Sequence, residues 1–263
     1  MLTPSLSFYF PQAVLLAALT ISAAANAEPL NVVSSGGFAA AYKQLAPRYE
    51  KASGQQIHSE WGASMGQTVN AIPQRLARHE PMDVVIMVGD ALDKLMDSGQ
   101  LVAGSKVYLA DSRIACAVPH GAPHPDIHTL EGLKSALLAA RSIAWSDSAS
   151  GEYIEKTMLK KLGVEDTVRA KGHKIPATPV GMIVARHEAD LGCQQRSELL
   201  PVAGIDIVGD LPEQVQYVTE FSAAVVASSV HQEEARRFLD FLAAPQNAAV
   251  IRETGLEPRT GEK

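Results

Sequence analysis

The chain has 263 residues, which is long enough for one large domain or two medium-sized ones, each with its own core. Hydrophobic residues make up 46% and charged residues 20%, a composition that excludes an intrinsically disordered chain. The formal net charge is -6 and no basic run is present, so we expect a small-molecule ligand and no nucleic acid as partner.

The first 27 residues contain the apolar stretch "PQAVLLAALTISAAANA", which ends in Ala25-Asn26-Ala27. An apolar core followed by a small-x-small pattern predicts a secretory signal peptide, although no Lys or Arg precedes it. The alternative is a membrane anchor, but the apolar core is too short to span a bilayer comfortably. We therefore expect a mature protein that begins near Glu28 and is exported and soluble.

From Leu30 onward, strand and helix patterns alternate. Strands are predicted over 30–35, 55–62, 82–89, 112–121, 190–195, 205–210 and 217–229. The segment 142–151 is predicted as a strand that runs into a small-polar loop. Helices are predicted over 37–54, 90–101, 129–140, 151–163 and 233–255, and a helical segment interrupted by Pro73 is predicted over 64–81. Repeated β-α units indicate parallel sheets covered by helices, and two successive series of them predict an α/β fold with two lobes.

Three loops of small polar residues follow predicted strands and precede predicted helices: "SSGG" (34–37), "WGASMG" (61–66) and "WSDSASG" (145–151). In open α/β sheets, ligands bind beyond the carboxyl ends of the strands. Free N–H groups at helix starts favour anions, so three such loops meeting at one cleft would form an anion site. The alternative for any single loop is an ordinary turn or helix cap.

Cys116 and Cys193 are the two cysteines, and both lie in apolar, strand-like segments. An exported protein permits a disulfide between them, whereas two buried thiols are the other interpretation. The sequence contains no CxxC or HExxH motif, and its histidines lack metal-ligand spacing, so we expect neither a metal nor another cofactor.

The segments "SSGGF", "GAS", "MDVVIMVGDALDKLMDSGQLV" and "EARRFLDFLAAPQNAAVIRETGLEP" resemble the periplasmic molybdate-binding proteins of ABC importers. The resemblance covers about Leu30 to Pro258. It implies the two-lobe fold of type II periplasmic binding proteins, with a ligand cleft between the lobes and a two-strand hinge. Lobe 1 would comprise 28–112 plus 217–263 and lobe 2 would comprise 113–216. The fold also implies a monomer.

The same resemblance implies a changed ligand. The serine that the family places just before the first helix falls near Gly37, and the family's tyrosine position falls at Gln195, whereas Ser64 keeps the serine of the "GAS" loop. Amides and hydroxyls in place of these groups favour a multi-carboxylate ligand over molybdate.

One branch of the family, the periplasmic aconitate isomerases, is similar to this chain in "SSGGFAAAY", "GASMG", "AIPQRLARHEPMDVVIMVG", "SDSASGEYI" and "QQRSELLPVAGID". The resemblance implies interconversion of trans- and cis-aconitate by an allylic proton shift without a cofactor. The alternative is a non-catalytic solute-binding protein, which would deliver an organic carboxylate or a molybdate-like oxyanion to an ABC permease.

For the isomerase, we expect Ser35, Ser64 and His173 to be catalytic. His173 is predicted to lie in a polar loop of lobe 2, "KGHKIPATPVG", and histidine is a common acid-base residue, although a surface histidine is the other interpretation. Arg75 would pair with a substrate carboxylate or lie on the surface. The predicted substrate-binding residues are Gly36, Gly37, Met65, Ser146, Ser148, Ser150, Gly151, Val180, Gln194 and Gln195.

Overall fold

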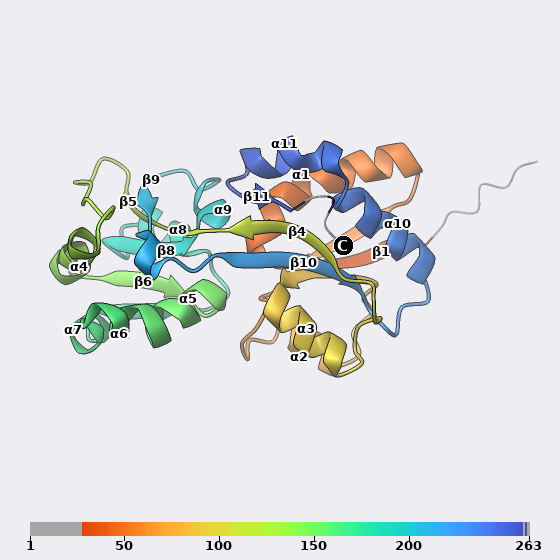
Figure 1. Ribbon diagram of the computed structural model, residues 1–263, viewed down its shortest axis with the longest axis horizontal. Helices are drawn as coiled ribbons and strands as arrows, with labels where there is room; N and C mark the ends of the chain where they lie inside the picture. Colours follow the sequence, from red (N-terminus) through yellow and green to blue (C-terminus); the bar gives the residue numbers. More distant parts are fainter. Residues whose placement is uncertain (1–27, 260, 262–263) are drawn as a thin grey trace, which may run out of the picture.

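The structure is a computed structural model that describes residues 28–259 and 261. The predicted signal peptide over 1–27 lies outside the described residues. Within the described part of the chain, no helix combines the length and the apolar character needed to cross a membrane. Figure 1 shows two lobes side by side, each built around its own sheet.

Lobe 1 contains a six-stranded sheet in the order β11-β4-β10-β3-β1-β2. Its strands are β1 (Leu30–Ser34), β2 (Ile57–Trp61), β3 (Val84–Val88), β4 (Val107–Ser112), β10 (Thr219–Val225) and β11 (Glu257–Pro258). Its helices are α1 (Gly36–Ser53), α2 (Ile72–Ala77), α3 (Gly89–Asp97), α10 (Gln232–Leu242) and α11 (Ala248–Glu253). The helices α1, α10 and α11 cover one face of the sheet, and α2 and α3 lie on the other (Figure 1).

Lobe 2 contains a five-stranded sheet in the order β7-β6-β8-β5-β9. Its strands are β5 (Ile114–Pro119), β6 (Ile143–Ser146), β7 (Gly172–Ile175), β8 (Leu191–Gln195) and β9 (Ile205–Asp210). Its helices are α4 (Leu130–Ala139), α5 (Ala149–Tyr153), α6 (Leu159–Leu162), α7 (Glu165–Arg169), α8 (Val180–Ala185) and α9 (Arg196–Leu199). A π-helical turn over Ile154–Met158 joins α5 to α6.

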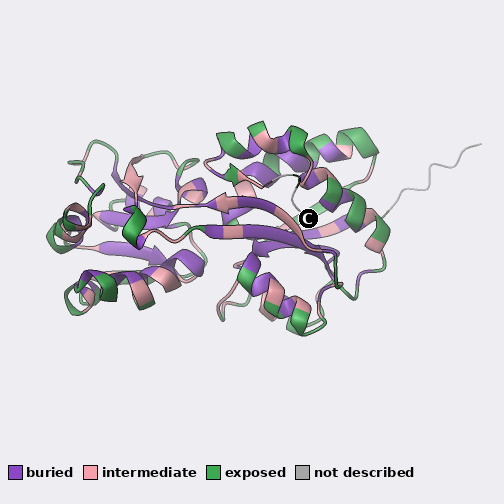
Figure 2. Cartoon of the chain, in the orientation of Figure 1, coloured by how far each residue is buried: buried purple, intermediate pink, exposed green. Residues whose placement is uncertain are grey.

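Strands in the middle of each sheet are the most deeply buried. The central strand β3 is buried along its whole length, as its continuous apolar run predicted. In β5, residues 114, 116 and 118 pack into the core beneath α4 to α7, whereas Ala115 and Ala117 pack toward Leu199 of α9. This alternation is the two-residue period of a strand that is covered on both faces. Figure 2 shows the buried strands running through both lobes.

Two chain crossings connect the lobes. Arg113 alone separates β4 from β5, and the second crossing runs from the end of β9 to the start of β10. The side chain of Gln216 ties the crossings together, because its amide accepts from the Ile114 N–H at 2.8 Å and donates to the Ile114 carbonyl at 3.0 Å. We propose these crossings as the hinge and as the lobe boundaries.

The expectation of parallel sheets is only partly correct. Strands β2, β1 and β3 are parallel, and so are β7, β6 and β8, but β10 is antiparallel to β3 and β4. In lobe 2, β5 is antiparallel to both neighbours. Strands β5 and β10 enter a lobe across the hinge rather than after a helical crossover. The two-residue strand β11, which follows α11, is also antiparallel to its neighbour β4. Strand β4 was not predicted at all.

Prolines set two helix boundaries that the sequence analysis misplaced. The predicted helix over 233–255 is divided into α10 and α11, because Pro245 lacks an N–H and Ala244 before it is extended. The predicted helix over 64–81 begins only at Ile72, with Pro73 in its first turn. The "GASMG" loop therefore ends in bends and does not itself open a helix.

Cys116 and Cys193 form a disulfide. The two residues face each other in the register of β5 and β8, and both side chains lie in the core between the sheet and α4 to α7. The interpretation as two buried thiols is therefore wrong. The bond joins the neighbouring strands β5 and β8 of the lobe 2 sheet, and its two cysteines are 77 residues apart in sequence.

Candidate ligand-binding site

Two adjoining cavities lie between the lobes. The larger, of about 330 Å³, is lined by residues 36, 39, 43, 61–63, 70, 146–148, 177–179, 194 and 198. The smaller, of about 20 Å³, is lined by residues 35–37, 64, 88, 148–150, 195, 198 and 221. Gly36, Ser148 and Glu198 belong to both linings. The larger cavity has the size of a small-molecule site, and the smaller one has room for about one water-sized group.

The "SSGG" segment forms the junction between β1 and α1. Ser35 is the N-cap of the 18-residue helix α1, but its side chain makes no capping bond. Its hydroxyl oxygen is buried, has no partner among the described residues, and belongs to the lining of the smaller cavity. An unsatisfied buried hydroxyl next to the free N–H groups of a long helix is suited to bind an anionic oxygen.

The two glycines serve close packing rather than a turn. A Cβ on Gly36 would lie 2.8 Å from Oε2 of Glu198, and a Cβ on Gly37 would lie 2.0 Å from Cζ of Phe221. Gly37 is therefore required by the aromatic ring of β10, which occupies the space that a side chain at this position would need. Gly36 leaves room for a carboxylate at the start of α1.

The serines of the other two loops are held by short-range contacts. Ser64 Oγ accepts from the Val88 N–H at 3.0 Å, which fixes the "GASMG" loop to the end of β3. Between the end of β6 and the start of α5, the hydroxyls of Ser146 and Ser150 lie 3.2 Å apart, and the Ser148 N–H points to Ser146 Oγ at 3.4 Å. Ser64, Ser148 and Ser150 line the smaller cavity, so both lobes contribute hydroxyl groups to it.

The two glutamines at the end of β8 are both buried. Gln194 Oε1 accepts from the Val180 N–H at 2.8 Å, and its Nε2 donates to Oε2 of Glu198. Gln195 Nε2 donates to Thr219 Oγ1 at 2.8 Å, which leaves Oε1 buried and without a partner in the described structure. Rotating this amide by 180° would keep a hydrogen bond with the Thr219 hydroxyl and turn a donor into the cavity.

Glu198 lines both cavities but was not among the predicted site residues. It is half-buried on α9, one helical turn beyond the end of β8, and burial raises the pKa of its carboxyl group to about 7. A raised carboxyl pKa in a cleft is a typical property of acid-base residues. The available signal was the spacing of "QQRSE", which places a glutamate four residues after Gln194, just past the carboxyl end of a strand.

Lys43 was also missed. It lies on α1 and lines the larger cavity, where its ammonium group is 4.9 Å from the ring centroid of Trp61. Asp147 is the other charged residue in this lining besides Glu198. Lys43 therefore supplies the cavity's cationic charge and is available to a carboxylate ligand.

Four predicted site residues line neither cavity. His173 is exposed on the edge strand β7, paired with Ala144 of β6, so its placement in a polar loop is wrong. The Val180 N–H donates a hydrogen bond to Gln194 Oε1, and Met65 packs against the lobe 1 core. Gly151 lies against the Ser146 carbonyl, where a Cβ would come within 1.7 Å of the oxygen.

Arg75 does not face the cleft either. Its guanidinium pairs with Glu60 and, at 2.6 Å, with Glu80, and the side chain is nearly buried. Both carboxylates are within lobe 1, so the guanidinium is already paired there. Arg75 is therefore neither a substrate anchor nor a surface residue, the two positions predicted for it.

Adding a serine at position 37 is expected to disrupt the site rather than to restore the family's hydroxyl. In Gly37→Ser, the new side chain would displace the buried Phe221 ring, and we expect a loss of about 1–3 kcal/mol in unfolding free energy. Chemical denaturation measures this loss. The matched control is Ala40→Ser on the same helix, which should change stability little.

The Phe221→Ala variant distinguishes a steric cause from other effects. If the ring is the obstacle, the double variant Gly37→Ser/Phe221→Ala loses less stability than the sum of the single variants. Strict additivity of the two losses would contradict the steric explanation.

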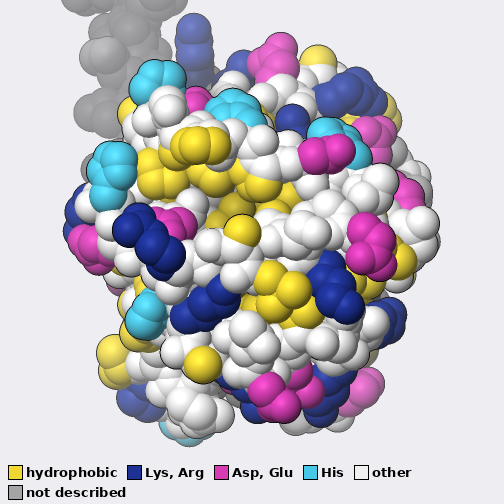
Figure 3. Space-filling view, turned by 90° about the vertical axis from the view of Figure 1, so that its left-hand side faces the viewer, with side chains coloured by type: hydrophobic (Ala, Val, Ile, Leu, Met, Phe, Trp, Pro, Cys, Tyr) yellow, Lys and Arg dark blue, Asp and Glu magenta, His cyan; other side chains and the backbone are white. Residues whose placement is uncertain are grey.

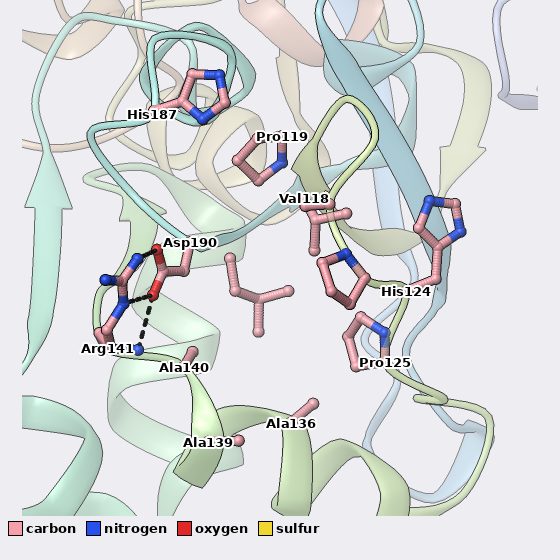
Figure 4. A pocket seen from close by; sticks show the side chains of 13 residues that line it. Val118, Pro119, His124, Pro125, Ala136, Ala139, Ala140, Arg141, His187 and Asp190 are labelled. Atoms are coloured by element: carbon pink, nitrogen blue, oxygen red, sulfur yellow. Dashed lines mark hydrogen bonds and ion pairs between the residues drawn. The ribbon is translucent and has the colours of Figure 1, made fainter.

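A separate cavity of about 500 Å³ lies at the far end of lobe 2, between the loop after β5, α4 and the start of β8. Figure 3 shows hydrophobic side chains gathered on this end of the molecule with histidines around them. In Figure 4, Arg141 and Asp190 face each other at one side of the cavity, where Nε and Oδ2 are 3.0 Å apart. Its walls are mainly alanine and proline, and Arg141 and Asp190 already pair with each other.

The two-lobe fold and the cleft with converging hydroxyls, amides and a helix start define a solute-binding type of protein. The family model of bacterial extracellular solute-binding proteins matches residues 30–257, and the chain belongs to this family. It is 48% identical over 246 residues to the aconitate isomerase of a Pseudomonas species, an alignment that covers 94% of each chain.

More distant relatives share the fold. The molybdate-binding protein ModA of Azotobacter vinelandii is 24% identical over 254 residues, covering 92% of this chain and 95% of the relative. The solved periplasmic molybdate-binding protein of Azotobacter vinelandii superposes with a TM-score of 0.69 at 22% identity, covering 86% of this chain and 98% of that one. The expected type II periplasmic binding protein fold is confirmed.

Proposed function

We propose that the protein is an isomerase that interconverts trans-aconitate and cis-aconitate in the cleft between its lobes. The observation that carries the proposal is the 48% identity to an aconitate isomerase over 94% of the chain. The reaction moves a C=C bond within a tricarboxylate, and no group enters or leaves the molecule.

The cleft has the groups that this reaction needs. A tricarboxylate requires several donors, which Ser35, Ser64, Ser148, Ser150 and the start of α1 offer, and Lys43 adds a positive charge. Removing a proton next to a carboxylate develops negative charge on that carboxylate, and N–H and O–H donors already in place stabilise it.

The proposal includes the location of the protein in the cell, its oligomeric state and its independence of a cofactor. The disulfide between Cys116 and Cys193 fits an oxidising compartment, as does membership in a family described as extracellular. We propose export to the periplasm after removal of the signal peptide over 1–27. A monomer that acts without a metal or organic cofactor is the proposed active form.

Turnover tests the function directly. Residues 28–263 are purified, dialysed against a chelator and mixed with trans-aconitate, and the acids are separated by chromatography. We expect conversion to a mixture of both isomers with a turnover number on the order of 1–10³ s⁻¹. A boiled sample controls for spontaneous isomerisation.

The alternative function is a receptor that carries an organic acid or a molybdate-like oxyanion, and the solute-binding family favours it as second candidate. Calorimetry with trans-aconitate and with molybdate separates the two. Saturable binding of trans-aconitate without conversion would assign the receptor function to an organic acid. Tight binding of molybdate without conversion of trans-aconitate would assign it to the oxyanion. Because Gly37 and Gln195 replace oxyanion-binding hydroxyls, we expect weak molybdate binding.

A further inference from the structure

We propose that Glu198 is the catalytic base that removes the allylic proton and returns it to the other end of the three-carbon unit. The inference rests on the proposed isomerase function. Glu198 lies where the two cavities meet, and it is the carboxylate common to both linings. A substrate that fills the larger cavity and extends a carboxylate oxygen into the smaller one would pass directly beside it.

The position of Glu198 depends on contact between the lobes. Helix α9 belongs to lobe 2 and α1 to lobe 1, and Ser197 Oγ donates to the Gly37 carbonyl at 2.7 Å in a buried contact. On the same short helix, Arg196 turns away and pairs with Asp210 at 2.9 Å. This contact between the lobes holds Glu198 beside Gly36 at the start of α1, where the two cavities adjoin.

The carboxylate is oriented by one hydrogen bond. Gln194 Nε2 donates to Oε2, and the Gln194 carbonyl oxygen is itself held by the Val180 N–H. No described residue donates a hydrogen bond to Oε1, so this oxygen is open to the cavity. A carboxylate held at one oxygen has its other oxygen available to accept a proton from a substrate bound in the cavity.

The local charges favour transfer at neutral pH. Lys43 from α1 and Asp147 from the loop after β6 are the other charged groups in the larger lining, and the smaller lining contains none besides Glu198. Burial raises the pKa of Glu198 to about 7, which matches the range in which a base both loses and regains a proton. Its neighbour Ser35 has a buried, unpartnered hydroxyl that is available to a substrate carboxylate.

The chemical step balances without another reactant. Glu198 Oε1 takes a proton from the methylene carbon, and the C–H electron pair enters the conjugated system as a dienolate whose charge lies on the carboxylate oxygens. Protonated Glu198 then gives the proton to the carbon that was vinylic, and the double bond occupies the neighbouring position. The conformation in which the cleft holds the former single bond sets the geometry of the new double bond as cis or trans.

The test compares Glu198→Gln and Glu198→Asp with wild type. In Glu198→Gln, the side-chain carbonyl still accepts from Gln194 but cannot take a proton. We expect kcat to fall at least 10³-fold while the dissociation constant for trans-aconitate, measured by calorimetry, changes less than about tenfold. Glu198→Asp should keep measurable activity, about 10–100-fold reduced, because the acid is retained but displaced. Glu188→Gln, an exposed glutamate paired with Arg186, is the matched control.

Two further readouts separate a base from a structural group. Wild-type kcat/KM should decline as pH falls through about 7, because Glu198 becomes protonated. In D₂O, wild type should exchange deuterium into aconitate, detected by NMR, and Glu198→Gln should not.

Each outcome decides between the two proposals. If wild type is active and Glu198→Gln keeps more than a tenth of the wild-type kcat, Glu198 is not the base, and the isomerase function still holds. If kcat is lost in Asp147→Asn instead, Asp147 is the base. A wild type with no conversion and no exchange would overturn both the isomerase function and the base.

Discussion

Removing the disulfide by replacing Cys116 and Cys193 with alanine is expected to lower the unfolding free energy by about 2–5 kcal/mol. The bond closes a loop between residues 77 apart in sequence, and both sulfurs are buried in the lobe 2 core. Opening it restores conformational freedom to the unfolded chain, and the alanines leave unfilled volume between the sheet and its helices. Urea unfolding followed by circular dichroism measures the loss.

Reduction provides the control for this experiment. Wild type treated with a reductant should approach the stability of the double-alanine variant, and the variant itself should not respond to the reductant. Lobe 1 contains no cysteine, so a probe there such as Trp61 should report a smaller shift if the lobes unfold separately. An unfolding midpoint that is equal for oxidised wild type and the variant would refute the expectation.

The second large effect is a change of stability with pH in Glu198→Gln. The folded protein holds the Glu198 proton up to a pKa of about 7, whereas the unfolded chain releases it near 4.5. Folding therefore takes up a proton between these values, and the wild type loses stability as pH rises through this window. Glutamine carries no charge to desolvate, so we expect the variant to gain about 1–2 kcal/mol relative to wild type between pH 5 and pH 8, a value reduced for partial exposure.

This stability measurement is independent of catalysis. Unfolding free energies of wild type, Glu198→Gln and the control Glu188→Gln are compared at pH 5, 6, 7 and 8 without ligand. The difference between wild type and Glu198→Gln should grow with pH, and the difference for the control should stay constant. A difference that stays flat from pH 5 to 8 would show that Glu198 has an ordinary acidity.

The local pattern of apolar and polar residues was sufficient to predict much of the fold. The continuous apolar run of β3, the period of α1 and the repeated strand-helix units predicted two α/β lobes, and the comparison with known solute-binding proteins confirmed the family. Local pattern failed where the chain crosses between lobes. A strand such as β10 has the same apolar residues whether it pairs parallel or antiparallel, so its direction depends on the hinge and not on its composition.

The site was partly predictable for a similar reason. Ser35, Ser64 and Ser148 lie in loops after strands, and Ser150 lies in the first turn of α5. General rules for α/β sheets place such strand-to-helix junctions at a cleft. His173 was predicted to lie in a loop because a polar stretch with two lysines indicates a loop, but the residue lies in the edge strand β7. An edge strand tolerates polar side chains because one of its sides faces solvent.

The amino-acid order alone was enough to establish the sheet-and-helix architecture and the convergence of hydroxyl-rich loops, because strand and helix periods and turn residues act over a few neighbouring positions. It was not enough to explain the two glycines of "SSGG" or to find Glu198. Gly36 and Gly37 are small because Glu198 and Phe221, more than 160 residues away in the chain, pack against them. The acidity of Glu198 likewise arises from burial between two lobes, a long-range property that no local pattern carries.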